Sequence, residues 1–102
     1  MAKGYWIVRV DVSDPEAYKA YVAANAEAFR NFGAHFLVRA GKYDTVEGMS
    51  RARNVVIEFK DHATALACYR SPEYSAAKAL RLGAATAEII VIEGYDGPQP
   101  QP

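Results

Sequence analysis

Arg53–Tyr74, with the sequence RNVVIEFKDHATALACYRSPEY, is the stretch that decides the fold. Apolar and polar residues alternate over residues 53–59, which predicts a strand with one apolar side. That side carries Val55, Ile57 and Phe59. Asp61 then fits the N-cap of a helix, and Ser71 fits the N-cap of a second one, because the proline that follows it suits a first helical turn. A strand followed by a broken helix predicts a pocket between helix and sheet.

The flanking segments predict three more strands and one long helix. We expect the strands at Tyr5–Val12, His35–Glu47 and Ala87–Glu93, and the helix from Pro15 to about Phe32. Either Asp14 or Ser13 caps that helix. Its buried stripe is expected to contain Tyr18, Val22, Ala26, Phe29 and Phe32. The glycine at Ala40–Gly41 indicates a bulge or a sharp bend in the second strand.

The resulting order, β-α-β-β-α-β, predicts an α+β fold of the ferredoxin-like type, an antiparallel sheet with helices on one face. A chain of 102 residues has room for one hydrophobic core. We therefore expect residues 1–95 to form a single domain. Residues 96–102, rich in proline and glutamine, are expected to form a flexible tail.

One face of the predicted sheet is left without helices. It is expected to carry Tyr5, Ile7, Arg9, Asp11, Leu37, Arg39, Val56 and Glu58. Apolar residues mixed with opposite charges suit a sheet that packs on another sheet. Because the chain has no second sheet, the expected partner is a second copy, in a two-fold homodimer through the sheet faces.

The composition narrows the classes of function. Twelve basic residues balance twelve acidic ones, which speaks against nucleic-acid binding. No apolar run approaches the ~18 residues of a membrane span, and no secretory leader is expected. The single cysteine, Cys68, fits a reducing compartment, so a soluble cytoplasmic protein is expected. The seven tyrosines, four phenylalanines and one tryptophan suggest a ligand pocket or an oligomer interface.

From Gly4 to about Gly94 the chain resembles the domain of unknown function 1330 family, in the dimeric α/β-barrel superfamily. The resemblance rests on YWIVRVDVSDPEAYKAYV, HFLVRAG, Glu47-Gly48, VVIEF, YRSPEY and AKALR. It implies a ferredoxin-like fold in which two protomers join their sheets face to face. Cys68 stands where the family often has tryptophan, so the resemblance implies nothing about ligand size.

Most of the candidate site residues fall into two groups, and each group has a functional and a structural interpretation. The first group lies on one sheet face and contains Arg9, Arg39 and Glu58. These residues could bind a carboxylate or orient a proton donor. The favoured alternative is an ion-pair network at the dimer interface. The second group consists of tyrosines on helices that face the sheet: Tyr18, Tyr21, Tyr69 and Tyr74. Their phenols could contact a ligand or relay protons, but a place in the core is more usual.

The remaining candidates are single residues. His35 opens a strand and could face a pocket, although an edge position is favoured. Arg81 could complement the helix dipole or reach a ligand, and the dipole role is favoured. No cluster of histidine, cysteine and carboxylate residues has metal-ligand spacing, so neither a metal nor another cofactor is expected. Cys68 is expected to be a small buried residue.

Two functions remain open. The first is a metal-free enzyme of the isomerase, decarboxylase or monooxygenase type, acting on a small polar or aromatic metabolite. The aromatic residues and the charged side chains near the sheet favour it. The second is a non-catalytic homodimeric module that binds a metabolite or a protein, which the lack of an acid–base–nucleophile set favours.

Overall fold

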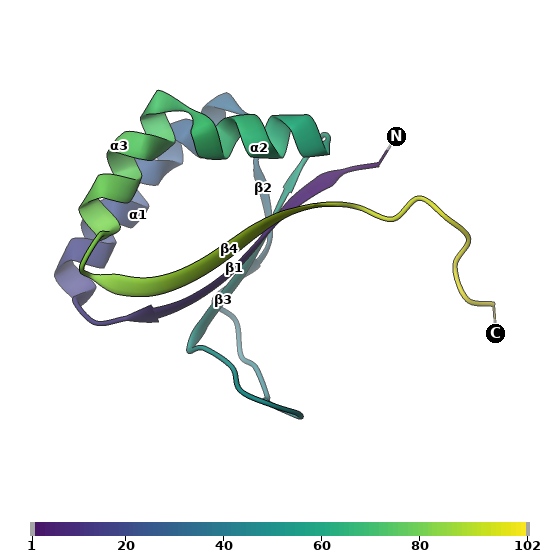
Figure 1. The fold of residues 1–102 in the computed structure, drawn as a ribbon, viewed down its shortest axis with the longest axis horizontal. Coiled ribbons are helices and arrows are strands. Elements are labelled where there is room, and N and C mark those ends of the chain that lie inside the picture. The colour runs from purple at the N-terminus through teal and green to yellow at the C-terminus, as the bar shows by residue number, and fades with distance from the viewer. Residues whose placement is uncertain (1, 102) are drawn as a thin grey trace.

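The computed structural model describes residues 2–101. Its elements are β1 (Gly4–Val12), α1 (Pro15–Asn31), β2 (His35–Arg39), β3 (Arg53–Phe59), α2 (His62–Arg70), α3 (Pro72–Arg81) and β4 (Ala85–Glu93). The strands form one antiparallel sheet in the order β2-β3-β1-β4, and the three helices cover one face of it (Figure 1). This is the ferredoxin-like arrangement that the sequence predicts. Met1 and Pro102, the outer ends of the predicted domain and tail, lie outside the described residues.

Each helix begins at the side-chain cap expected from the sequence. Asp14, rather than Ser13, caps α1: its carboxylate accepts a hydrogen bond from the amide of Ala17 at 3.3 Å. Asp61 accepts from the amide of Thr64 at 2.8 Å, and the Ser71 hydroxyl accepts from the amide of Tyr74 at 3.1 Å. These bonds satisfy amide groups that have no partner inside the helix. Ser71 has an extended backbone with ψ of 152°, which separates α2 from α3.

The buried stripe of α1 contains four of the five predicted residues, because Val22 and Phe32 are partly buried against the core. Ala26 is exposed, whereas Tyr21, Asn25 and Ala28 are buried beside the correctly predicted Tyr18 and Phe29. The buried positions 18, 21, 25 and 28 also follow a regular helical period. The consequence is that a polar residue, Asn25, lies inside the protein.

The second strand is shorter than predicted, because β2 ends at Arg39. Ala40 adopts a left-handed backbone conformation with φ of 55°, and its amide donates to the carbonyl of Asn54 at 2.9 Å. The chain then leaves the sheet, and residues 40–52 form an exposed loop on the side away from the helices (Figure 1). The fourth strand begins two residues earlier than predicted, at Ala85.

An irregularity within β2 changes which side chains face the helices. Phe36 pairs with Ile57, but Val38, not Leu37, pairs with Val56, so the register shifts at Leu37. Because side chains alternate strictly in a regular strand, one extra residue reverses the face of everything after it. Arg39, predicted on the helix-free face, therefore lies opposite Val55 on the helix side.

The core lies between the sheet and the helices and is built around Trp6. Its ring is fully buried and meets Phe29 and Tyr74 edge to face, with centroids 5.2 and 4.9 Å apart. The indole N–H donates to the carbonyl of Ala65 at 2.8 Å, which satisfies the only polar atom of that side chain. Cys68 is buried in the same core, as predicted.

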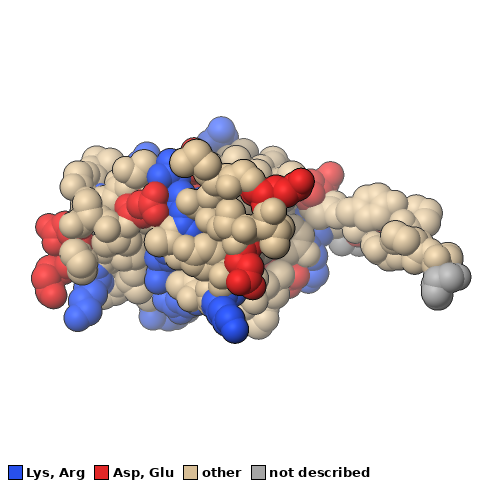
Figure 2. Space-filling view, turned by 90° about the horizontal axis from the view of Figure 1, so that it is seen from below, with Lys and Arg blue, Asp and Glu red and all other residues tan. Residues whose placement is uncertain are grey.

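The helix-free face of the sheet is mostly apolar at its centre. Figure 2 shows this face, on which acidic and basic groups are scattered among other residues. Ile90 and Ile92 of the edge strand β4 are about half exposed there, at 55% and 48%. Residues 94–101 contain neither helix nor strand and lead away from the sheet; the flexibility of this tail stays a prediction.

Candidate small-molecule site

A cavity of about 30 Å³ lies between α1 and the sheet. Its lining residues are Trp6, Val8, Tyr18, Tyr21, Val22, Asn25, Phe29, Phe36, Arg39, Arg53, Val55 and Ile57. One part of the lining is aromatic and aliphatic, and the other part is polar and cationic. The volume exceeds the ~10–15 Å³ that one buried water needs, so a few small atoms fit without rearrangement.

Arginine side chains are prominent around this cavity. The Arg39 guanidinium lies 4.1 Å from the ring centre of Phe36, and the Arg53 guanidinium lies 5.4 Å from that of Tyr18. Arg81, only 7% exposed, lies 5.2 Å from the ring centre of Tyr21. Within residues 2–101 none of these three arginines forms a salt bridge. Each of the three guanidiniums instead lies against an aromatic ring, which is a favourable contact for a cation.

Several polar atoms around the cavity lack a hydrogen-bond partner. They are the side-chain oxygen of Asn25 and the Nε atoms of Arg53 and Arg81, all of them buried. A buried polar group without a partner costs free energy, so each of these atoms requires a partner such as a water molecule or a ligand. The oxygen of Asn25 is an acceptor, and the two Nε–H groups are donors.

Tyr18 contributes a phenol to the cavity. Burial raises its pKa, and the nearby guanidiniums of Arg53 and Arg81 counter this effect only in part. The phenol is therefore protonated at neutral pH and can donate a hydrogen bond or a proton. Behind it, the buried hydroxyls of Tyr21 and Tyr74 lie 2.7 Å apart, and burial raises the pKa of Tyr74 as well.

The structure brings together only part of the predicted site. Tyr18 and Arg39 line the cavity, and Arg81 and Tyr74 lie directly behind Tyr21. The placement of Arg39 beside Arg9 and Glu58 was wrong, because the register shift in β2 moves Arg39 to the other face.

The other predicted residues lie away from the cavity. Glu58, on the helix-free face, accepts a hydrogen bond from the hydroxyl of Tyr5 at 3.3 Å. His35 is exposed on the edge strand β2, as the favoured interpretation had it. Tyr69 lies in a separate groove with Leu66 and Ile89, where its hydroxyl accepts a hydrogen bond from Lys78 at 3.0 Å.

Two important residues of the cavity were not among the sequence candidates. Arg53 follows the same alternation as Val55 and Ile57, so extending the apolar face of that strand by one step would have found it. Asn25 is a polar residue within the buried period of α1, and a correct helical phase would have found it. Both residues could therefore have been found from the local sequence pattern.

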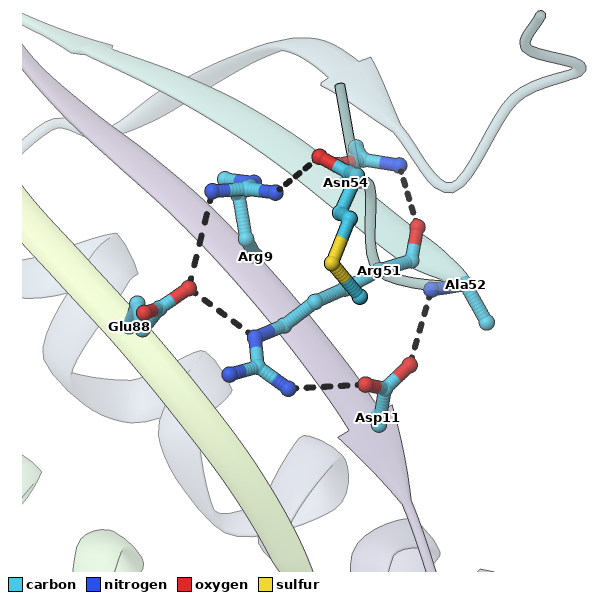
Figure 3. Close-up of polar contacts among 7 residues, drawn as sticks. Arg9, Asp11, Arg51, Ala52, Asn54 and Glu88 are labelled. Carbon is cyan, nitrogen blue, oxygen red and sulfur yellow. Dashed lines mark hydrogen bonds and ion pairs between the residues drawn. The ribbon is translucent and has the colours of Figure 1, made fainter. Parts of the chain in front are cut away.

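Arg9 belongs to a polar network at the far end of β1, on the helix-free face (Figure 3). It lies 3.6 Å from Glu88 and donates to the carbonyl of Met49 at 3.2 Å. Arg51 bridges Glu88 at 2.9 Å and Asp11 at 2.8 Å. The backbone amide of Ala52 also donates to Asp11 at 2.9 Å. The network ties the 40–52 loop to β1 and β4.

The carboxylates of this network are held in the ionised form. The hydrogen bond from the amide of Ala52 and then that from Arg51 lower the pKa of Asp11. The hydrogen bond from Arg51 lowers the pKa of Glu88. Because these groups are charge-paired with one another and largely solvated, the network anchors the loop and leaves no free charge for a substrate.

Neither a metal site nor a membrane segment emerges from residues 2–101. No three histidine, cysteine or acidic side chains in that range lie close enough to hold a metal ion. None of the helices formed by those residues has the length and apolar character to cross a membrane.

Comparison with known proteins supports the fold and leaves the activity open. No curated protein matches the sequence of this chain. Among solved structures, a protein of unknown function from Rhodopseudomonas palustris, RPA0582, is similar with a TM-score of 0.74 and 17% identity, over 94% of this chain and 85% of that one.

Two further structures share the fold. SnoaB from Streptomyces nogalater, described as a cofactor-independent oxygenase, has a TM-score of 0.61 and 14% identity, over 100% of this chain and 99% of that one. A dimeric ferredoxin-like protein of unknown function from Thermobifida fusca has a TM-score of 0.56 and 14% identity, over 89% and 92%. At such identities the likeness shows the fold alone. The family model described as domain of unknown function (DUF1330) matches residues 3–95, and the chain belongs to that family.

Proposed function

We propose that this protein is a small homodimeric enzyme that acts on a small polar or aromatic metabolite in the cavity between α1 and the sheet. The observation that carries the proposal is the cavity itself, with an aromatic wall, a phenol and guanidinium groups facing one space. Small-molecule sites are typically apolar hollows with a few well-placed polar groups. SnoaB, of the same fold, is described as an enzyme that needs no cofactor, which agrees with such a role.

The side chains around the cavity can supply two kinds of chemistry. Tyr18, kept protonated by burial, can donate a proton or a hydrogen bond to a ligand oxygen. Arg39 and Arg53 can stabilise negative charge that develops on an enolate or carboxylate, since guanidinium groups hold oxyanions through charged hydrogen bonds. Isomerisation, decarboxylation and substrate-carbanion oxygenation all pass through such anions.

One observation favours the second function, a non-catalytic binding module. The lining of the cavity, as far as residues 2–101 define it, contains no carboxylate and no imidazole that could remove a proton. An enzyme of this kind would then need the substrate itself, or a partner protomer, to provide the base. Binding without turnover needs neither.

The homodimer is proposed from the helix-free face. Ile90 and Ile92 are exposed there beside the partly exposed Ile7 and Val56. The 40–52 loop adds two more exposed apolar side chains, Val46 and Met49, at 88% and 93% exposure. An exposed patch of this kind marks an interaction surface, and a two-fold pairing of identical sheets covers it on both copies. The Thermobifida fusca structure is described as dimeric.

The test of the small-molecule function uses a blocked cavity. The purified protein is incubated with a metabolite extract, separated from unbound compounds, and analysed for retained molecules by mass spectrometry. Val22→Phe places a ring in the cavity, whereas Ala26→Phe places the same ring on the exposed side of the same helix. Retention by the parent and A26F, but not by V22F, is the expected result.

Two outcomes of that experiment decide the proposal. If V22F retains the same compounds as the parent, the cavity is not the binding site. Where retention depends on the cavity, the retained compound is then incubated with the protein and followed by chromatography. Conversion above the V22F background identifies an enzyme, and an unchanged compound identifies the binding module.

A further inference from the structure

We infer that the cavity selects anionic ligands and holds one carboxylate group against the guanidinium of Arg53, with the charge of Arg81 behind Tyr21 strengthening the attraction. This inference rests on the proposed small-molecule function and names the chemical class of its ligand. The charges around the cavity are unbalanced. The described surroundings of the cavity include three arginines but no aspartate or glutamate among the lining residues.

Arg53 and Arg81 lie against two neighbouring tyrosine rings. The ring centres of Tyr18 and Tyr21 are 5.3 Å apart. The Arg53 guanidinium lies 5.4 Å from the first ring, and that of Arg81 lies 5.2 Å from the second. Both guanidiniums also act on the phenol of Tyr18 electrostatically. Two positive charges thus act on the region of Tyr18 and Tyr21, and together they favour an anion in the cavity that these rings line.

Contacts with aromatic faces leave the Nε–H groups of these arginines unused. The Nε–H groups of Arg53 and Arg81 are buried and have no acceptor within residues 2–101. A guanidinium with a free Nε–H can bind a carboxylate through two parallel hydrogen bonds, an arrangement specific to planar oxyanions. Water can satisfy one donor at a time, but it cannot neutralise the charge.

The size and the walls of the cavity define the rest of the ligand. A volume of about 30 Å³ admits the head group of a ligand, so the remainder of the ligand must lie outside the cavity, towards the exposed Arg39. The ring of Phe36, with the exposed Arg39 guanidinium 4.1 Å from its centre, lies on the edge-strand side. The buried side-chain oxygen of Asn25 needs a donor, such as a hydroxyl of the ligand. We therefore expect a hydroxylated or aromatic carboxylic acid whose carboxylate enters first.

Sodium acetate and acetamide test this inference, because the two molecules have nearly the same shape and differ in charge. At pH 7.5 and constant ionic strength, acetate should shift the arginine Nε–H signals of Arg53 and Arg81 in ¹⁵N NMR spectra, with saturation in the millimolar range. Acetamide should shift them at least tenfold less at equal concentration. Arg53→Gln should weaken the acetate response at least tenfold, and Arg81→Gln should weaken it less, both measured on Tyr18 and Asn25 signals.

Arg51→Gln serves as the matched control, since Arg51 is already paired with Asp11 and Glu88 on the opposite face. It should leave the acetate response unchanged. An equal response to acetamide, or an R53Q or R81Q variant that is folded by circular dichroism and responds like the parent, would overturn the inference. So would a parent protein that shows no saturable acetate response. These results would leave the small-molecule function in place if, in the metabolite-retention experiment, the parent retained a neutral metabolite and V22F did not.

Discussion

The hydroxyl groups of Tyr21 and Tyr74 lie 2.7 Å apart in the interior, where α1 and α3 pack against each other. Tyr74 is fully buried, so its hydroxyl depends on this contact. Tyr21 also lines the cavity, and Tyr74 lies behind it. One hydrogen bond thus joins the packing of two helices to the shape of the site.

The first prediction concerns this pair. Tyr21→Phe and Tyr74→Phe should each lower the free energy of unfolding by about 1–2 kcal/mol, because each leaves one buried hydroxyl without its partner. The double variant should cost less than the sum, with a coupling of about 1 kcal/mol. Urea unfolding of the four proteins measures the cycle. Strictly additive losses would mean that the two hydroxyls do not interact in solution.

The second prediction concerns the pH dependence of the loop anchor. The pKa values of Asp11 and Glu88 are lowered in the folded protein. Their contribution to stability is therefore present above the unfolded values, about 4, and is lost as the pH falls through the lower folded values. Arg51→Gln should lower the melting temperature at pH 7, and its difference from the parent should shrink steadily below pH 4.

Arg30→Gln is the control for that titration. Arg30 is exposed in the last turn of α1 and forms no salt bridge within the described chain. Its substitution should give no such pH dependence. A difference between R51Q and the parent that stays constant from pH 7 to pH 2.5 would show that the network does not hold the carboxylates in their ionised form.

The third prediction concerns Cys68. Burial, and to a lesser degree the charge of Glu73, raises the pKa of this thiol to about 12. Only roughly one thiol in 10⁴ is ionised at pH 8, and the thiolate is the reactive form. Alkylation by iodoacetamide at pH 8 should be at least 100-fold slower in the native protein than in 8 M urea. Comparable rates would place the thiol at the surface and reopen a nucleophilic role.

Much of the fold could be predicted from local patterns. The alternation over Arg53–Phe59 and the caps at Asp14, Asp61 and Ser71 give the order of elements and most of their bounds. These signals work because each depends on a few neighbouring residues. The family resemblance agreed with them over almost the whole chain.

The site could be predicted only in part, for a reason that lies in β2. Alternation assigns Arg39 to the same face as Arg9, and the assignment holds only if the strand is regular. The extra residue at Leu37 reverses it, and nothing in the local pattern marks that position. In α1 the stripes through Ala26 and through Asn25 are both regular helical periods, and the packing of α1 against α3 and the sheet decides between them.

The fourth prediction concerns the sheet-to-sheet homodimer. Ile90 lies on the edge strand β4, opposite Ile7 on the helix-free face, and is 55% exposed. Ile90→Asp would bury a carboxylate without a partner in a dimer interface, at a cost of about 3 kcal/mol or more. A two-fold axis places the substitution on both copies. Sedimentation velocity should therefore show a dimer for the parent and a monomer for I90D at the same micromolar concentration.

Leu80→Asp provides the comparison on the other side of the molecule. Leu80 is 47% exposed on α3, which covers the opposite face of the sheet. The same charge at that position should leave the dimer intact, so a monomer in both variants would indicate general destabilisation, which far-ultraviolet circular dichroism would reveal. A parent protein that sediments as a monomer would disprove the pairing of sheets. The exposed isoleucines of β4 and the apolar tip of the 40–52 loop would then need a different partner to cover them.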